Sequence, residues 1–423
     1  MLLYTVKFQK RIITKHFVLS CAKFIWGSVK LKFSKSVLTI MLAASLAVSA
    51  SSYSESCIAY AIENAALQTD FSEAETLKIT DDTVLKLPVG QALTYSTITV
   101  SAGKTLTVKG GGSLVADKIT GGNLLINSGT VSANNVSSAV KLVNGSLCTS
   151  ESTGAVTVNG GSFQTDSLKS SLTVYEGSVN IGTYSASASN INIKGGTVEL
   201  GSAVCGSLYV SGGSLDYASK IDNNSEMSED ADESGLKIKA YNYVNIIGGS
   251  VTADSIDGGA IYFNGGVTET KSISGNDGGP VIIKNGNIKT DTLKGGDGIS
   301  SSESYTISDT TYNKNAGGSI IISDGIVEIG QELRAGNMVG NTGGEISITG
   351  GKVTVNGNVT AGDAPDYTSN VSGGSVTISQ NADVVINGNI KSGNGSNSDT
   401  SKYHANGGKG GNVHISGGTI KGN

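Results

Sequence analysis

The stretch INIKGGTVEL, residues 191–200, shows the pattern that decides the fold. Apolar and polar residues alternate on both sides of two glycines, Gly195 and Gly196. Alternation over a few positions indicates a half-buried β-strand. Glycine tolerates positive φ, so it lets the chain turn a tight corner between two such strands. The stretch therefore predicts a strand, a corner and a second strand.

The same pattern recurs along most of the chain. It reads apolar, any residue, apolar, two residues, glycine, any residue, apolar, and about fourteen copies are present when degenerate ones are included, which is typical of solenoids. A third short piece often follows, as in Asn358-Val359-Thr360 and Asn389-Ile390-Lys391. In the clear copies the second apolar residue is Ile126, Val158, Val174, Ile193, Val210, Ile246, Ile283, Ile348 and Ile415.

Three short strands joined by corners make one coil of a β-helix, and one coil alone cannot bury its inward side chains. Stacked coils satisfy the backbone hydrogen bonds and form one continuous apolar column. We therefore expect an all-β fold, a parallel β-helix or β-solenoid of about fourteen rungs, over residues 76–423. The alternative is a β-sandwich or an antiparallel barrel, which would show no fixed long period.

Several coils contain extra residues. These insertions, at 218–235, 294–316, 362–373 and 393–410, fall after a third strand or before the next first strand. We expect them to emerge at one corner of the solenoid. Insertions on one face of a solenoid often form its binding face, but surface loops are also tolerated at little cost, and the sequence leaves both interpretations open.

The N-terminal segment predicts export. Lys30, Lys32 and Lys35 precede an apolar run over 37–48, and small residues follow at 48–50. This order is typical of a secretory signal peptide, and the run is too short to span a bilayer comfortably. We expect a helical leader that ends at residue 50 or at residue 61, and a linker or N-terminal cap at 51–75.

Composition narrows the class of protein. The 423 residues include 59 glycines and are 38% hydrophobic, which is too apolar for a disordered tail. Glycine without a strict three-residue period argues against collagen. The formal net charge is -5, so the chain lacks the basic footprint of a nucleic-acid-binding protein. Four cysteines without CxxC spacing indicate neither a disulfide scaffold nor a zinc site.

Several β-helix proteins cleave polysaccharides, a reaction that needs clustered carboxylates or a positioned base. The only arginine beyond the leader is Arg334. Two histidines, His404 and His414, flank a glycine turn and mark no nucleophile. We expect no enzyme, and we assign no catalytic, cofactor-binding or metal-binding residue. Acidic residues follow second strands on different rungs, where they could form a ladder: Asp117, Asp166, Asp254 and Asp291.

Ligand signals are weak. The acidic stretch 222–233 could bind Ca²⁺ through its oxygen atoms, or it could be a solvated loop. The glycine-rich fragments 295–298 and 407–412 are faintly similar to calcium-binding nonapeptide repeats, but they do not recur in tandem. A sugar-stacking platform would have to use tyrosines that could equally be ordinary outward strand residues: Tyr175, Tyr184, Tyr209 and Tyr262.

The Gly-Gly-Ser/Thr-Val/Ile rungs and the Asn-Gly-Asn closers at 356–359 and 387–390 resemble the passenger regions of bacterial autotransporter adhesins. The charged and apolar order of residues 7–26 resembles their extended signal peptides, although a misplaced start codon would explain it equally well. The resemblance covers roughly residues 76–423 and implies a secreted or cell-surface protein.

Such a protein would attach to surfaces, matrix proteins or glycans, bind no nucleic acid, and meet a membrane only through its leader or a C-terminal anchor. The alternative is a carbohydrate-binding or polysaccharide-cleaving β-helix. No barrel or anchor follows Asn423 in the sequence, which is a departure from the resemblance. We therefore expect the chain to be truncated at its C-terminus.

Overall fold

A computed structural model of the chain describes residues 75–217, 235–307, 310–340, 342–365, 370–379, 381–397, 407–416 and 419–421. The leader expected at 1–50 or 1–61, most of the expected linker, the acidic stretch 222–233 and His404 lie outside these residues. The described residues belong to one compact unit. None of them forms an apolar helix of the length that a bilayer requires.

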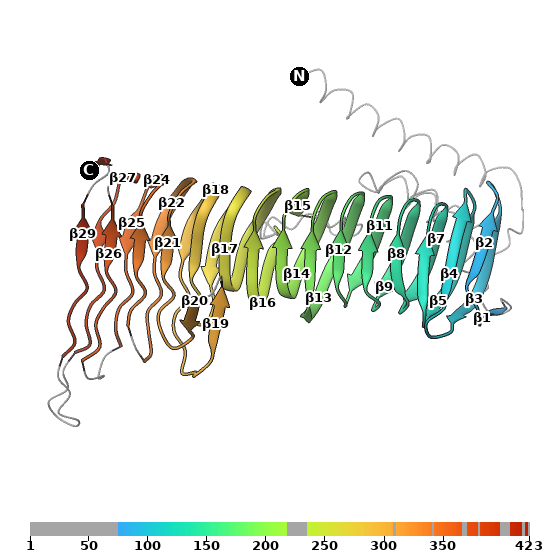
Figure 1. The fold of residues 1–423 in the computed structure, drawn as a ribbon, viewed down its shortest axis with the longest axis horizontal. Coiled ribbons are helices and arrows are strands. Elements are labelled where there is room, and N and C mark those ends of the chain that lie inside the picture. Colours follow the sequence, from blue (N-terminus) through green and yellow to red (C-terminus); the bar gives the residue numbers. More distant parts are fainter. Residues whose placement is uncertain are drawn as a thin grey trace, which may run out of the picture. The chain divides into compact units, whose positions relative to one another are not determined.

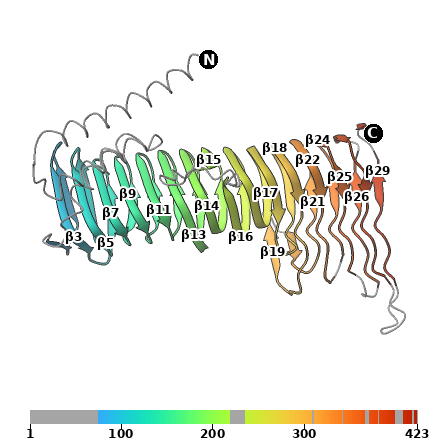
Figure 2. The ribbon, with the colours of Figure 1, turned by 180° about the vertical axis from the view of Figure 1, so that it is seen from behind.

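The described residues form strands and no helices (Figures 1 and 2). All the strands pair in parallel except β19 and β20, which form an antiparallel hairpin. The expectation of an all-β fold of stacked parallel strands is confirmed. The strands are β1 (Thr76–Ile79), β2 (Thr83–Leu87), β3 (Ala92–Val100), β4 (Thr105–Gly110), β5 (Ser113–Thr120), β6 (Asn123–Ile126), β7 (Thr130–Val136), β8 (Ala139–Leu142), β9 (Ser146–Ser152), β10 (Val156–Val158), β11 (Ser162–Leu168), β12 (Leu172–Val174), β13 (Ser178–Ile193), β14 (Thr197–Val210), β15 (Ser214–Tyr217), β16 (Lys237–Ile246), β17 (Ser250–Gly275), β18 (Val281–Lys294), β19 (Ser304–Ile307), β20 (Thr310–Asn313), β21 (Ile320–Ile322), β22 (Ile326–Arg334), β23 (Ile346–Ile348), β24 (Lys352–Val355), β25 (Asn358–Thr360), β26 (Val376–Ile378), β27 (Asp383–Ile386), β28 (Ile390–Lys391), β29 (Val413–Ile415) and β30 (Thr419–Lys421).

The chain returns repeatedly to three faces, and one passage through them is called a coil here. Face 2 follows the glycine corner, as in residues 162–165, and face 3 follows face 2, as in residues 167–168. Face 1 is centred in each coil on a triplet whose first and third residues point inward. These triplets are 106–108, 124–126, 140–142, 156–158, 172–174, 191–193, 208–210, 244–246, 261–263, 281–283, 320–322, 346–348, 376–378 and 413–415.

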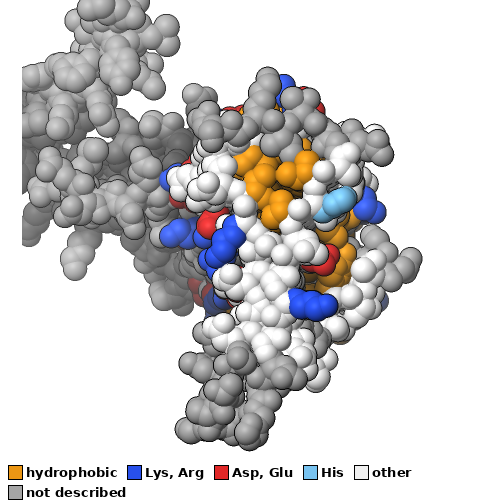
Figure 3. All heavy atoms as spheres, turned by 90° about the vertical axis from the view of Figure 1, so that its left-hand side faces the viewer, with side chains coloured by type: hydrophobic (Ala, Val, Ile, Leu, Met, Phe, Trp, Pro, Cys, Tyr) orange, Lys and Arg blue, Asp and Glu red, His pale blue; other side chains and the backbone are white. Residues whose placement is uncertain are grey.

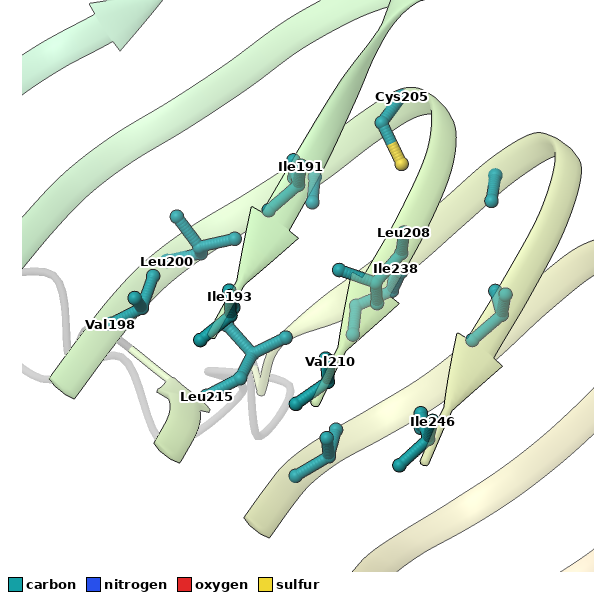
Figure 4. Packing of buried hydrophobic residues seen from close by; sticks show 14 of the residues in the cluster. Ile191, Ile193, Val198, Leu200, Cys205, Leu208, Val210, Leu215, Ile238 and Ile246 are labelled. Carbon is teal, nitrogen blue, oxygen red and sulfur yellow. The ribbon is translucent and has the colours of Figure 1, made fainter. Parts of the chain in front are cut away.

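Neighbouring coils pair residue for residue, so like side chains meet. Phe163 on face 2 lies between Leu147 and Val179, all buried. On face 1 the register aligns Ile193 with Val210 and Val210 with Ile246, and Figure 4 shows their side chains pointing into the interior. β-branched and aliphatic residues stack well on a pleated surface. The core is therefore one continuous column, and this architecture is solenoid-like.

Stacked glycines form most corners between face 1 and face 2. Gly177 and Gly196 have φ values of 93° and 74°, a region that other residues rarely adopt. A Cβ atom on Gly196 would lie 2.6 Å from the carbonyl oxygen of Gly177 in the preceding coil. The corner between β26 and β27 differs, because a turn in which Ala382 donates to the oxygen of Ser379 (3.2 Å) replaces the glycine pair.

The bend between face 2 and face 3 is built in more than one way. In several coils a buried threonine hydroxyl bonds to the backbone at the bend, as Thr165 does to the oxygen of Ser167 at 3.0 Å. Threonine suits this position because its hydroxyl can satisfy a bent backbone carbonyl. Other coils keep an aliphatic residue there and follow it with glycine, as in Ile181-Gly182 and Ile329-Gly330.

The insertions do not all emerge at one corner. Three of them, 294–316, 362–373 and 393–410, lie between face 3 and face 1, as expected. The fourth, 218–235, separates β15 on face 2 from β16 on face 3. The prediction of a single corner is therefore wrong for residues 218–235, because β15 ends its coil before a third strand has formed.

Glycines hold the base of the three insertions together, and Figures 1 and 2 show the described parts of these segments extending beyond the sheets beside β19 and β20. Each glycine N–H donates to the oxygen of the one before, at 2.7–2.9 Å. A Cβ atom at these positions would collide with the backbone of a neighbouring coil. The chain of hydrogen bonds links Gly279, Gly296, Gly318, Gly336, Gly344, Gly362, Gly374, Gly393 and Gly411.

The last described coil exposes part of the column. Val413 and Ile415 occupy inward positions in register with Val376 and Ile378, yet they are 44% and 46% exposed. In Figure 3 hydrophobic side chains gather in one patch on this side of the described residues. By contrast Ile79 of β1, at the other limit of the stack, is buried.

Candidate functional site

Three tyrosines gather on the outer surface of face 1. The strand alternation that points Leu208 and Val210 inward points Tyr209 outward. The register places Tyr209 beside Asn245 and Asn245 beside Tyr262, while Tyr243 stands two residues before Asn245 in the same coil. Tyr209, Tyr243 and Tyr262, called the tyrosine cluster here, thus come from three successive coils, and each is partly exposed.

Two of these rings make specific contacts. The Tyr209 and Tyr243 rings meet edge to face, with centroids 5.1 Å apart and an interplanar angle of 80°, an arrangement that aromatic pairs favour. Their hydroxyl groups are also hydrogen-bonded to each other. Burial, followed by the hydrogen bond and the charge of Tyr243, raises the pKa of Tyr209 to about 12. Tyr209 therefore keeps its proton at neutral pH, and its hydroxyl can both donate and accept hydrogen bonds.

Two lysines of face 1 lie over tyrosine rings, one over Tyr175 and the other over Tyr262 of the tyrosine cluster. The Lys194 ammonium is 4.7 Å from the ring centroid of Tyr175, and its Nζ donates to the Tyr175 hydroxyl at 3.4 Å. The Lys284 ammonium is 5.4 Å from the centroid of Tyr262. Both distances are within the range of cation–π attraction. Ile247, which is 50% exposed, adds apolar surface between them. The outer surface of face 1 therefore combines flat apolar rings with positive charge.

Of the four tyrosines that the sequence singles out, Tyr175, Tyr209 and Tyr262 lie on face 1. The prediction that Tyr184 could face outward is wrong, because its side chain points inward and is fully buried. It occupies the face 3 position of Leu168 and Ala203 in neighbouring coils, and the small Ala203 leaves room for its ring. Its hydroxyl donates to the oxygen of Asn190 at 3.3 Å. The sequence signal missed Tyr243, which follows a two-residue irregularity in the register before the triplet.

The four predicted acids lie at the bend between face 2 and face 3, on different coils. Asp117 accepts from the amide of Asn134 at 2.8 Å. Asp254 forms an ion pair with Lys271, with 3.1 Å between the carboxylate oxygen and the ammonium nitrogen. Burial raises the pKa of Asp166. The described residues contain no group of three or more His, Cys, Asp and Glu side chains placed to hold a metal ion.

The remaining candidates do not converge. Asp291 adjoins Lys271 across the register. Arg334 lies on face 3 between Lys294 and Thr360, and His414 lies on the outer surface of face 1 beside Thr377. Each of these side chains belongs to a different bend or face, so the described residues do not bring them together as acid, base and nucleophile.

A concave region lies among the inserted segments. It is a groove of about 810 Å³, and its lining includes Asn337, Asp363 and Asn394. The Asn337 side-chain oxygen accepts the backbone N–H of Asp363 at 2.9 Å. The Asp363 carboxylate in turn accepts the backbone N–H of Asn394 at 2.7 Å. Asp297 does the same for Asn337 at 2.7 Å. These side chains therefore hold successive coils together. Fragment 295–298, compared above with calcium-binding repeats, contributes to the same stacking.

Comparisons with known proteins identify no relative: no family model, no curated protein and no solved structure matches this chain. The geometry of face 1 thus carries the functional argument.

Proposed function

We propose that the chain is an exported adhesive protein, a parallel β-helix of about fourteen rungs, which attaches to carbohydrate through the outer surface of face 1. The leader expected at 1–50 supports export, and the resemblance to autotransporter passenger regions supports a secreted or cell-surface location. We propose no catalytic activity for it.

The single observation that carries this proposal is the tyrosine cluster. Aromatic rings present a flat apolar surface and, in tyrosine, a polar edge. A sugar ring is matched to such a surface, because it has an apolar C–H face and hydroxyl groups around its rim. The partly exposed Tyr209, Tyr243 and Tyr262 stand on rigid strands of one face, so their positions are fixed before a ligand arrives. Fixed side chains lower the entropy cost of binding.

The test is a glycan array probed with the full chain and with a variant in which the three cluster tyrosines are replaced by alanine. The control replaces Tyr312, which lies in the β19–β20 hairpin. Circular dichroism checks that each variant retains its β-structure. We expect the cluster variant to lose its glycan signals by at least about tenfold, since buried aromatic anchors dominate binding energy, and the control to keep them.

Two outcomes would contradict the proposal. Unchanged glycan binding by the cluster variant would remove face 1 as the attachment site. Release of shortened products from a polysaccharide, abolished by Asp166→Asn, would show an enzyme in place of an adhesive protein.

A further inference from the structure

The charges of the described residues are segregated between faces. Three outer rows are defined on face 1: the residue before each triplet, its middle residue and the residue after it. From the 106–108 triplet to the 320–322 triplet these rows contain no aspartate or glutamate. They contain four exposed lysines: Lys109, Lys141, Lys194 and Lys284. Acids stand just beyond these rows: Glu176 follows Tyr175, Asp324 follows Ser323, and Asp82 of the preceding coil accepts the backbone N–H of Thr105 at 2.8 Å.

Face 2 has the opposite character. The outward middle positions of its strands include Glu199, Asp216, Glu269 and Glu328. Lys289, which lies in the same row between the last two, is paired with Glu269 at 2.8 Å. The chain is acidic as a whole, with a formal net charge of -5. The stretch of face 1 from the 106–108 triplet to the 320–322 triplet is therefore basic on an acidic protein because of where the charges are placed, and this marks the stretch as a surface for an anionic partner.

We propose that the ligand of face 1 is an acidic polysaccharide, an inference that rests on the proposed attachment to carbohydrate. The tyrosine cluster stacks against sugar rings, while the four lysines, called the face 1 lysines here, pair with carboxylate or sulfate groups. Lys194 belongs to the coil before Tyr209, and Lys284 belongs to the coil after Tyr262. The two ammonium groups flank the cluster along the stacking direction, so the ligand runs across successive coils.

The spacing of the lysines distinguishes a polysaccharide from a nucleic acid. Successive face 1 lysines are two, three and four coils apart in the register, or about 10, 14 and 19 Å at the spacing of neighbouring strands. Duplex DNA carries one charge per about 1.7 Å and is bound by much denser lysine and arginine clusters. The widely spaced face 1 lysines, two of which flank the tyrosine cluster, suit a polymer that has one anionic group per one or two sugars.

The test measures binding of the full chain to polygalacturonate, alginate and heparin, each at low and high salt. Matched neutral probes are the methyl esters of the two carboxylated polymers and a desulfated, N-acetylated heparin whose carboxyl groups are methyl-esterified, with single-stranded DNA as a further probe. The variant replaces all four face 1 lysines by glutamine. A control with the same change in net charge replaces four exposed lysines of the other faces, Lys118, Lys237, Lys352 and Lys391.

We expect at least one anionic probe to bind about tenfold or more tightly than its neutral form, and high salt to weaken that binding. The face 1 lysine variant should lose this preference, and the control should keep it. Equal binding of charged and neutral forms, lost in the tyrosine variant, would overturn the acidic ligand but leave the attachment to carbohydrate intact. Binding to none of the polysaccharides, or tighter binding to DNA, would overturn both.

Discussion

Replacing a corner glycine tests whether adjacent coils touch at the backbone. Gly196→Ala adds a Cβ atom at φ 74°, 2.6 Å from the oxygen of Gly177. That oxygen accepts the N–H of Thr197 at 2.9 Å, so the corner must shift and weaken this bond. Left-handed φ costs a non-glycine residue about 1–2 kcal/mol, and a disrupted hydrogen bond costs about 1–2 kcal/mol more. We expect a total loss of about 3 kcal/mol.

Gly103→Ala is the matched control. Gly103 has the same φ of 74°, but a Cβ atom there meets nothing within 4 Å. It should therefore lose only the conformational part, about 1–2 kcal/mol. Urea unfolding followed by circular dichroism compares the two variants, and hydrogen exchange at Thr197 reports the corner itself, since repeat arrays can open locally. Equal losses in Gly196→Ala and Gly103→Ala would refute the close stacking of corners.

Three further variants probe the interior and the bend. Thr165→Val should lower the free energy of unfolding by about 1 kcal/mol, since it removes the buried hydroxyl that bonds to the backbone, while Thr252→Val on the exposed side of face 2 should change nothing in the same urea titration. Phe163→Ala should cost about 3–5 kcal/mol, measured as a lower urea midpoint, because its ring is 1% exposed. Asp166→Asn should raise the midpoint at neutral pH. Burial raises the folded pKa of Asp166 above its unfolded value, so the stability that its protonated form contributes is lost as pH rises through the folded pKa. The gain from asparagine should therefore disappear in acid.

The sequence predicts those parts of the fold that depend on local alternation. The spacing of Ile193, Gly196 and Val198 is enough to predict two strands and a corner, because strand period and glycine conformation are properties of a few residues. Parallel stacking follows from the repeat, since only neighbouring coils can cover the inward residues. The sequence also predicts turns at Gly296 and Gly318. It does not predict the hydrogen bond between them, because that bond joins two segments of neighbouring coils and no local pattern encodes it.

The candidate site is harder to predict because it depends on register. No local pattern in the sequence distinguishes the inward Tyr184 from the outward Tyr209. Tyr184 lies on face 3 beside Ala203, where a large side chain fits inside. The lysines of face 1 are spread over 176 residues, from Lys109 to Lys284, and they become one surface only when successive triplets are aligned.

Distances between spin labels along face 1 test the stacking of coils most directly. With one label at Lys141 and the second at Asn192, Asn245 or Ser347, the register gives three, five and nine coil steps. At about 4.8 Å per step, electron spin resonance should give separations that increase as about 14, 24 and 43 Å. Separations that do not rise by a constant increment per coil would contradict the stacked parallel fold, and with it the single face on which the tyrosines and lysines meet.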